Sequence, residues 1–392
     1  MRTPLVAIAV LAAGCGGGMR ATTRSIPRHA PRVEMDPIRV EAQRDASGAL
    51  RLTAYDAQSL FAAAGHDLAA GNCRRAVELY DRIAEQFPES RFVSASLYNA
   101  GLCLEDLHRD PQAVQRYTSL QSRLPDSPDI KDSLYRMGGC LERLGRWREA
   151  IATFDRALAR EDLTGDERLE AMARRGAATF ELGELVAAEQ QMRDALLYYR
   201  HGSGAEPIQT DFFAAEAQYY LGEVLRIRFE AVRFTPMEAE MRRELEEKCQ
   251  LLLDAQAAYI LAIRVTNPHW AAAAGYRIGN LFSTLYDHIV AAPVPPELDA
   301  EQREIYFDEL RRQVRPLVDK AVRVWERTMA MGARTGLGDN EWVERTRQGL
   351  ERLRAFLNPP HPAGAPMTPP LPGQQNSGPG AGGRPSAGTI SS

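Results

Sequence analysis

The sequence predicts an all-α protein, a right-handed solenoid of about six helical hairpins closed by a C-terminal capping helix. The main observation is a short phrase that recurs at Ala76, Ala113 and Ala150, 37 residues apart both times. Each phrase places an aromatic residue four positions after the alanine. A fixed period in this range is typical of hairpins that stack on their neighbours along the chain. Abundant alanine and the lack of strand-like runs of Val, Ile and Thr agree with close-packed helices.

Each copy is predicted to contain two helices, called A and B below. In the second copy helix A covers 97–104, and Gly101 marks a point where two helices must approach closely. Pro111 suits the first turn of helix B, because its missing N–H needs no partner there. Tyr117 and Leu120 then continue one apolar face at helical spacing.

This pattern resembles the tetratricopeptide repeat (TPR). The resemblance rests on the Ala-x3-aromatic phrases and on glycines and prolines at matching distances, namely Gly101 and Gly138 inside helix A, Gly71 and Gly145 in turns, and Pro88 and Pro125 at the ends of copies. The family unit has about 34 residues, so the longer period here implies longer helices or loops. Three copies in register make the match specific.

The repeats become less regular toward the C-terminus. We expect regular TPR repeats over 55–200 and degenerate, TPR-like repeats over 205–357. The charged stretch 238–248 is predicted to be a helical insertion in the fifth copy, and 341–357 a terminal capping helix.

The N-terminus carries the features of a secretory signal at 1–14. Arg2 precedes an apolar run over 5–13 that is too short to span a bilayer. Leu11-Ala-Ala-Gly-Cys15 resembles a bacterial lipobox, although leucine stands one place too early. The resemblance implies that Cys15 carries the lipid, as palmitate and related chains, and Gly16 after it favours the outer membrane. An ordinary secretory signal cut nearby is the alternative.

Two segments are expected to lack a fold. Residues 15–54 show little periodicity and several glycines and prolines, which predicts a flexible tether. Residues 358–392 consist mostly of Pro, Gly and Ser and cannot bury enough apolar surface to fold. The net charge of −4 over 392 residues gives no electrostatic reason to expect a nucleic-acid partner.

Four cysteines remain if Cys15 is lipidated. Cys73 opens one helix B and Cys103 lies late in the following helix A, so antiparallel packing brings them near each other. A disulfide between them is possible in an oxidising compartment, and two small buried residues in a helix interface are the alternative. No cysteine or histidine spacing predicts a metal site.

The sequence contains no recognisable catalytic motif. HExxH, Walker and GxSxG patterns are all absent from it. We therefore expect a protein that is not an enzyme and that needs no cofactor. The degenerate region 230–310 leaves room for a hidden active site, which a pocket with convergent acidic or histidine side chains would indicate.

One constellation suggests a binding site. Aromatic residues recur three positions before the A-helix glycine position, at Phe61, Tyr98, Tyr135, Tyr219 and Tyr276. In TPR folds the A helices line a concave groove, so the resemblance implies a ladder of aromatics that grips a peptide. Polar neighbours expected on this face are Asn99, Glu105, Asp132, Glu142, Arg143, Glu223 and Arg226. The aromatics can instead fill space between neighbouring A helices, and both interpretations stay open.

These features together predict a scaffold. The chain is similar in plan to TPR lipoproteins of the bacterial outer membrane, which implies a membrane-anchored protein that faces the periplasm. Its expected partners are other envelope proteins or peptides, in an assembly, motility or secretion complex. The alternative is a protein that recruits or regulates enzymes acting on peptidoglycan, or that binds the glycan itself.

Overall fold

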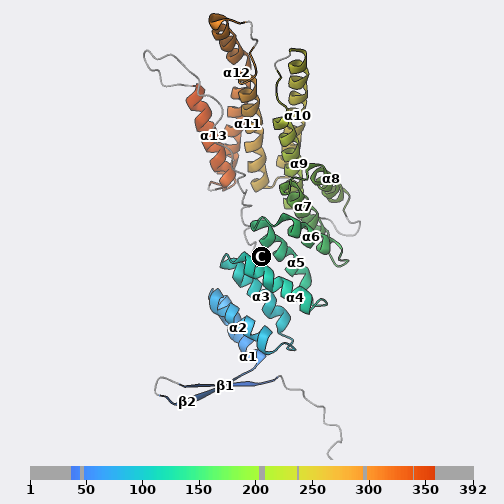
Figure 1. Ribbon diagram of the computed structural model, residues 1–392, viewed down its shortest axis with the longest axis vertical. Coiled ribbons are helices and arrows are strands. Elements are labelled where there is room, and N and C mark those ends of the chain that lie inside the picture. The colour runs from blue at the N-terminus through green and yellow to red at the C-terminus, as the bar shows by residue number, and fades with distance from the viewer. Residues whose placement is uncertain are drawn as a thin grey trace, which may run out of the picture. The chain divides into compact units, whose positions relative to one another are not determined.

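The computed structural model describes residues 37–44, 48–202, 208–235, 238–294, 298–338 and 340–357. The chain divides into two units, Met1–Ala57 and Gln58–Ser392. Within the described residues the first unit holds a two-stranded hairpin and the second a series of helices (Figure 1).

The helices form six hairpins in chain order, each with a first helix A and a second helix B. These hairpins are α1 (Ala57–Ala69) with α2 (Cys73–Gln86), α3 (Val93–Asp106) with α4 (Asp110–Arg123), α5 (Ile130–Arg143) with α6 (Trp147–Leu158), α7 (Gly165–Glu181) with α8 (Leu185–His201), α9 (Phe212–Ala231) with α10 (Glu238–Arg264), and α11 (Pro268–Val290) with α12 (Ala300–Arg334). A last helix, α13 (Glu341–Leu357), follows them. The predicted all-α, TPR-like solenoid is thus confirmed.

Several helix starts follow directly from local sequence. Pro111 lies in the first turn of α4, where a missing N–H costs nothing. Thr164 and Glu167 form a capping box at the start of α7, and Asp299 and Gln302 form another at the start of α12. Each box satisfies backbone N–H groups that the first helical turn leaves without partners.

The repeated phrase encodes the contact between the two helices of a hairpin. The B-helix aromatics Tyr117, Phe154, Tyr259 and Trp325 are buried, and each lies directly over the glycine of its own A helix, Gly101, Gly138, Gly222 and Gly279 respectively. A Cβ at any of these glycines would clash with the ring. The glycine and the aromatic residue therefore form one packing unit, which explains why the sequence repeats them together.

The later hairpins are longer than the early ones. The charged stretch 238–248 forms the first part of the 27-residue α10. Helix α12 has 35 residues and contains Pro316. Helix α13 packs against both α11 and α12, so it covers two helices of the last hairpin rather than its end alone.

The N-terminal strands differ from the expected tether over 15–54. Strand β1 (Arg39–Arg44) pairs antiparallel with β2 (Leu50–Tyr55). Each run alternates over only six residues and mixes charged with apolar side chains, so it gave a weak strand signal. The rest of the expected tether, 15–36 and 45–47, lies outside the described residues, as do the predicted signal 1–14 and tail 358–392.

The register of this hairpin separates its side chains by face. Val40 pairs with Ala54, and Ala42 pairs with Leu52. Because paired residues point to the same side of a sheet, one face is mostly apolar. Val40, Leu50 and Leu52 on that face are exposed. Among the described helices, none is long and apolar enough to cross a bilayer.

Candidate functional site

The aromatic residues of the first three A helices are half-buried, and two of them pack against neighbouring rings. Phe61 stacks on Phe92, with 4.9 Å between ring centroids. Tyr98 lies 6.0 Å from the ring of Tyr117. Tyr135 donates a hydrogen bond of 2.8 Å from its hydroxyl to the backbone carbonyl of Glu167 in the next A helix. Phe61 and Tyr135 therefore contact the following repeat, and all three side chains keep part of their surface exposed.

The two later aromatics, Tyr219 and Tyr276, lie in a cluster of rings that includes Trp342 of α13. Tyr219 is only 3% exposed, and its ring contacts those of Tyr259, Trp270 and Trp342. Tyr276 is half-buried and also contacts Trp342. The expectation that Tyr219 lines an open groove is corrected, because Trp342 of α13 packs on it. Filling space between helices is the role that the structure gives Tyr219.

The polar residues of the A helices form ion pairs between successive repeats. Arg136 pairs with Glu105 at 2.9 Å, and Arg174 of α7 pairs with Glu142 of α5 at 2.7 Å. The corresponding pair between α11 and α9 joins Arg277 to Glu223 at 2.8 Å. Each arginine stands two positions before the glycine of its A helix. We call this series the A-helix ion-pair ladder.

These three arginines were not among the site residues predicted from the sequence. The available signal was their fixed place between the repeated aromatic position and the repeated glycine, as in Tyr135-Arg-Met-Gly138 and Tyr276-Arg-Ile-Gly279. Arginine beside acidic residues at helical spacing is also typical of a solvated helix face, so this signal alone does not indicate a contact between repeats. The pairing partner of each lies in another repeat, which no local spacing reveals.

Glu223 is a buried acid of the ladder, at 3% exposed. Its Oε1 accepts hydrogen bonds from the Tyr259 hydroxyl at 2.5 Å and pairs with the Arg277 Nε at 2.8 Å. Its Oε2 pairs with Arg226 at 3.1 Å. Burial alone would raise the pKa of Glu223, but the charges of Arg277 and Arg226 lower it below its ordinary value. The carboxylate therefore stays ionised inside the protein.

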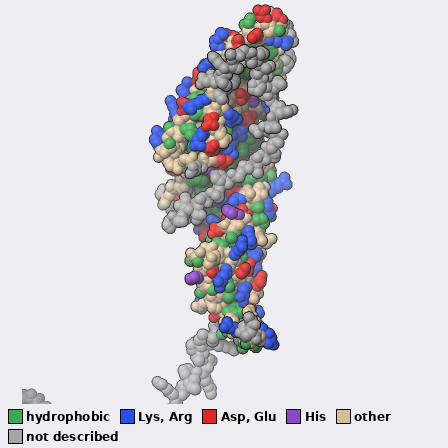
Figure 2. Space-filling model, turned by 90° about the vertical axis from the view of Figure 1, so that its left-hand side faces the viewer, with side chains coloured by type: hydrophobic (Ala, Val, Ile, Leu, Met, Phe, Trp, Pro, Cys, Tyr) green, Lys and Arg blue, Asp and Glu red, His purple; other side chains and the backbone are tan. Residues whose placement is uncertain are grey.

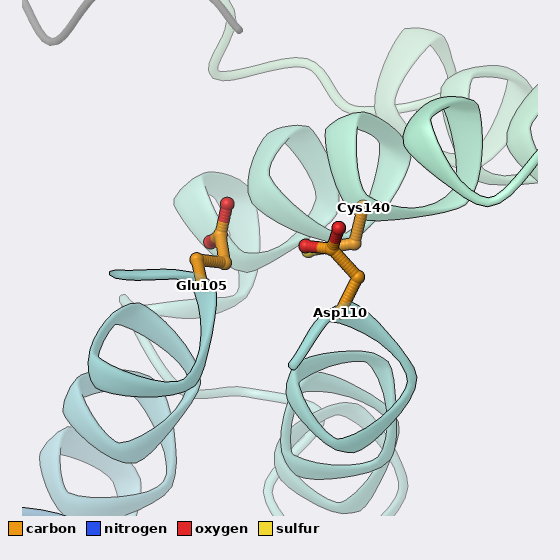
Figure 3. A group of neighbouring side chains, drawn as sticks. All are labelled: Glu105, Asp110 and Cys140. Carbon is orange, nitrogen blue, oxygen red and sulfur yellow. The ribbon is translucent and has the colours of Figure 1, made fainter. Parts of the chain in front are cut away.

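A second cluster joins the second and third repeats. Arg143 of α5 contacts Glu105 at 2.8 Å and Asp110 at 2.6 Å. Tyr117 donates its hydroxyl hydrogen bond of 2.7 Å to Glu105. Asp110 and Cys140 lie close to Glu105 in this cluster (Figure 3).

Glu105, Asp110 and Cys140 each offer an atom that could bind a metal ion, and these atoms lie within 4.8 Å of one another. Arg143 already neutralises both carboxylates. Burial, followed by the charge of Glu105, raises the pKa of the Cys140 thiol, whereas a metal ligand must be a thiolate. We therefore assign this group as an ion-pair cluster between repeats.

Apart from Asp132, the remaining polar residues predicted for the groove are also engaged within the chain or buried. Glu142 is 5% exposed and pairs with Arg174. Asn99 donates a hydrogen bond of 3.4 Å to the Tyr80 hydroxyl, and Arg226 also pairs with Glu230. Asp132 is exposed on α5. We call the half-exposed edges of Phe61, Tyr98 and Tyr135, with Asp132, the A-helix surface.

The charged residues show no large region of one sign in the view of Figure 2. Basic and acidic side chains are interspersed over the visible described surface. This distribution agrees with the small net charge of −4 and does not favour a polyanionic partner.

Cys73 and Cys103 are both free and buried. Burial, followed by the adjacent Cys73 thiol, raises the pKa of Cys103 to about 12. The two cysteines are thus neighbours, as antiparallel packing predicted, and the structure holds them as thiols in a helix interface. Cys15 lies outside the described residues.

A buried lysine closes the C-terminal end of α9. Lys248 of α10 donates hydrogen bonds from Nζ to the backbone carbonyls of Phe229 and Val232, at 2.6 and 2.8 Å. Burial, followed by the charge of Arg233, lowers its pKa to about 8. His288 of α11 stacks on the ring of Phe229. The lysine thus caps carbonyls that the helix end leaves without partners.

Lowering the pH is expected to decrease the free energy of unfolding, because His288 is harder to protonate in the folded chain than in the unfolded one. Burial, followed by the charges of Lys248 and Arg233, lowers the pKa of His288 from 6.5 to about 4. The unfolded chain therefore binds this proton first, so the free energy of unfolding decreases as the pH falls from about 6.5 to about 4. Because the ring is partly exposed, we expect a loss of about 1 kcal/mol.

The measurement is urea unfolding followed by circular dichroism across this pH range. His288→Gln removes the titrating group, so the variant should lose that part of the slope. An unchanged slope in the variant would contradict the assignment.

Two grooves lie between successive B helices, over the A helix that separates them. The first has a volume of about 860 Å³, lies between α4 and α6, and includes Met137 of α5. The second has a volume of about 420 Å³, lies between α10 and α12, and includes Ile278 of α11. Met137 and Ile278 occupy the same repeat position, directly before the A-helix glycine. The lining of the second groove contains no histidine, aspartate or glutamate.

Comparison with known proteins supports the repeat type. Residues 132–161, which cover most of α5 and all of α6, match the family model described as tetratricopeptide repeat. The comparison with curated proteins found no match.

Several solved TPR structures are similar to the chain. One is the C-terminal part of a TPR repeat-containing protein from Cytophaga hutchinsonii, with 13% identity, a TM-score of 0.40, and coverage of 75% of this chain and 95% of that chain. A tetratricopeptide repeat protein from Parabacteroides merdae has 15% identity, a TM-score of 0.37, and coverage of 74% and 98%. MamA from Desulfovibrio magneticus has 15% identity, a TM-score of 0.34, and coverage of 51% and 96%. With such low identities and TM-scores, these likenesses bear on neither partners nor activity.

The chain thus contains a tetratricopeptide repeat within a series of TPR-like hairpins. A stack of such units presents extended surfaces suited to binding other proteins.

Proposed function

We propose that this chain is a lipid-anchored scaffold of the bacterial outer membrane, facing the periplasm, that binds segments of other envelope proteins. The observation that carries the scaffold role is the run of six helical hairpins, each packed against its neighbours along the chain. Such a stack offers a long surface for contacts with other proteins. The anchor and the location are supported by the N-terminal sequence, with its short apolar run and Cys15.

The A-helix surface is the proposed contact for the partner. Tyr98 and Tyr135 lie at equivalent positions of successive A helices and are half-exposed. Tyrosine gives a large contact area at a small loss of side-chain entropy. Because the acids and arginines around them are paired within the chain, the aromatic edges would supply most of the binding energy.

The anchor is tested by replacing Cys15 with alanine in intact cells. We expect the native chain to incorporate labelled palmitate and to sediment with outer membranes, and the variant to do neither. Crosslinking followed by affinity purification should recover specific envelope proteins with the native chain, and fewer of them with the variant. Native protein that carries no lipid would refute the anchor.

The A-helix surface is tested by the double variant Tyr98→Ala/Tyr135→Ala. Partner recovery should fall about tenfold, which corresponds to about 1.4 kcal/mol of binding free energy, while helicity stays unchanged. Val186→Ala on α8 is a matched control, because Val186 is 78% exposed outside the A-helix surface. Normal recovery with the double variant would show that the partner binds elsewhere on the chain.

A further inference from the structure

The groove between α10 and α12, called the α10–α12 groove below, has an aliphatic floor. Ile260 and Ile263 come from α10, Ile278 from α11, and Val324 and Met331 from α12. Leu253 lies about two turns before Ile260 on α10 and is 54% exposed, so apolar surface continues beyond the groove. An apolar groove of this kind is a common site for protein segments that have an apolar face.

One rim of this groove is basic. Lys320, Arg323 and Arg327 line it from α12. Their spacing of three and four residues places them in one stripe along the helix. Lys320 lies over the ring of Phe282 at 4.3 Å. Arg323 and Arg327 are exposed, and neither forms an ion pair with a residue that the structure describes.

The groove between α4 and α6 differs from the α10–α12 groove in the polarity of its lining. Its lining uses equivalent repeat positions, but Thr118 and Gln121 stand where the α10–α12 groove has Ile260 and Ile263. Two of the three arginines in its lining form ion pairs within the chain. Arg116 pairs with Asp81 at 2.7 Å, and Arg146 pairs with Glu149 at 2.6 Å. The α10–α12 groove therefore has isoleucines where the earlier groove has Thr118 and Gln121. Two of its arginines, Arg323 and Arg327, have no ion pair among the described residues, whereas the earlier groove has one such arginine, Arg156.

We propose that the α10–α12 groove binds an acidic amphipathic helix of a partner protein. The apolar face of that helix would cover Ile260, Ile263 and Ile278. Carboxylates at positions i, i+3 and i+7 along one edge would match the stripe of three cations on α12. This inference rests on the proposed scaffold function and gives it a second, chemically defined surface.

Other occupants fit the groove less well. The C-terminal segment 358–392 of this chain contains no aspartate or glutamate, so it cannot supply the carboxylates. Single-stranded nucleic acids are commonly bound by stacking of their bases on aromatic side chains, and the groove lining contains none. A helix with both apolar and acidic side chains matches the floor and the rim together.

The test uses the purified full chain and two synthetic helical peptides. Both carry leucine on one face, and one has glutamate and the other lysine at i, i+3 and i+7 beside it. Fluorescence anisotropy should show binding of the glutamate peptide, at least about tenfold weaker binding of the lysine peptide, and weaker binding of the glutamate peptide as salt increases.

The groove is located by the double variant Arg323→Glu/Arg327→Glu. We expect it to weaken binding of the glutamate peptide at least about tenfold, with the circular dichroism spectrum unchanged because both residues are exposed. Arg156→Glu is the matched control, since Arg156 occupies the position equivalent to Arg327 in the groove between α4 and α6. It should leave the affinity within about twofold.

Several results would overturn the proposal. Binding of the glutamate peptide that survives the Arg323/Arg327 variant, or that is lost instead with Tyr98→Ala/Tyr135→Ala, would place the peptide elsewhere. Binding to phosphatidylglycerol vesicles through the two arginines, without binding of either peptide, would assign the groove to anionic lipid. If neither peptide binds while the cellular purification still recovers partners, the groove inference fails and the scaffold function stands. If no partner is recovered either, both fail.

Discussion

Replacing Glu223 with alanine is expected to lower the free energy of unfolding by about 3–5 kcal/mol. The substitution leaves the guanidinium groups of Arg226 and Arg277, with exposed side-chain fractions of 14% and 19%, without their shared carboxylate. It also removes the acceptor for the hydroxyl of Tyr259, which is fully buried. Breaking a buried ion pair on one side costs more than the pair contributes, because a desolvated charge remains.

Urea unfolding followed by circular dichroism measures this loss as a shift of the midpoint. Glu344→Ala on α13 is the control, since Glu344 forms a pair with Arg347 in which both side chains are more than 40% exposed. A surface pair of this kind contributes at most about 1 kcal/mol. If the two variants shifted the midpoint equally, Glu223 would be solvated and the ladder would not hold α9 against α11.

The ladder explains why part of the predicted groove is structural. Glu105, Glu142 and Glu223 were expected to face a partner because they share a helical face with the aromatic positions. That face packs against the next A helix in the chain. The acids therefore form ion pairs with arginines of the following repeat, and these carboxylates are not free to bind a partner. A sequence shows which residues share a face of one helix, but not how closely the next helix covers it.

The features that depend on short-range spacing were predicted well. The distance from Ala113 to Tyr117 and the glycine at 101 define a helix pair locally, and the structure places Tyr117 over Gly101. The turn glycines Gly71 and Gly145 have φ of +76° and +66°, a conformation that glycine adopts without strain. These signals act over a few residues, so one copy of the repeat contains all of them.

The features that depend on distant segments were not predicted. Trp342 covers Tyr219 from more than a hundred positions away in the chain. The α10–α12 groove likewise joins Ile260, Ile278 and Arg323 from three helices. The strands around Val40 and Leu52 were missed for a different reason, because two runs of six residues without a buried face give little alternation to detect.

The packing of the last hairpin is expected to be highly sensitive to the contact between Gly279 and Trp325. Trp325 is 2% exposed, and its Nε1 donates a hydrogen bond of 2.9 Å to the backbone carbonyl of Tyr276. Trp325→Ala should cost about 3–5 kcal/mol, because it leaves a cavity between α11 and α13. Gly279→Ala should cost about 1–3 kcal/mol, since its Cβ would clash with the indole, even though alanine favours a helix by about 1 kcal/mol.

The double variant Gly279→Ala/Trp325→Ala distinguishes a shared contact from two separate defects. With the indole removed, the new methyl group enters space that the ring occupied, so the double variant should cost less than the sum of the two single variants. We expect a coupling energy of about 1–3 kcal/mol from urea unfolding of all four proteins.

Gly65→Ala on α1 is the control, because nothing lies within 4 Å of the position its Cβ would take. It should stabilise the chain by up to about 1 kcal/mol. Additive costs for Gly279 and Trp325 would contradict the packing unit. A clear coupling would mean that glycine is needed at position 279 because the aromatic ring occupies the space of a Cβ. The same argument would then apply to Gly101, Gly138 and Gly222, each of which lies against an aromatic ring of its own B helix.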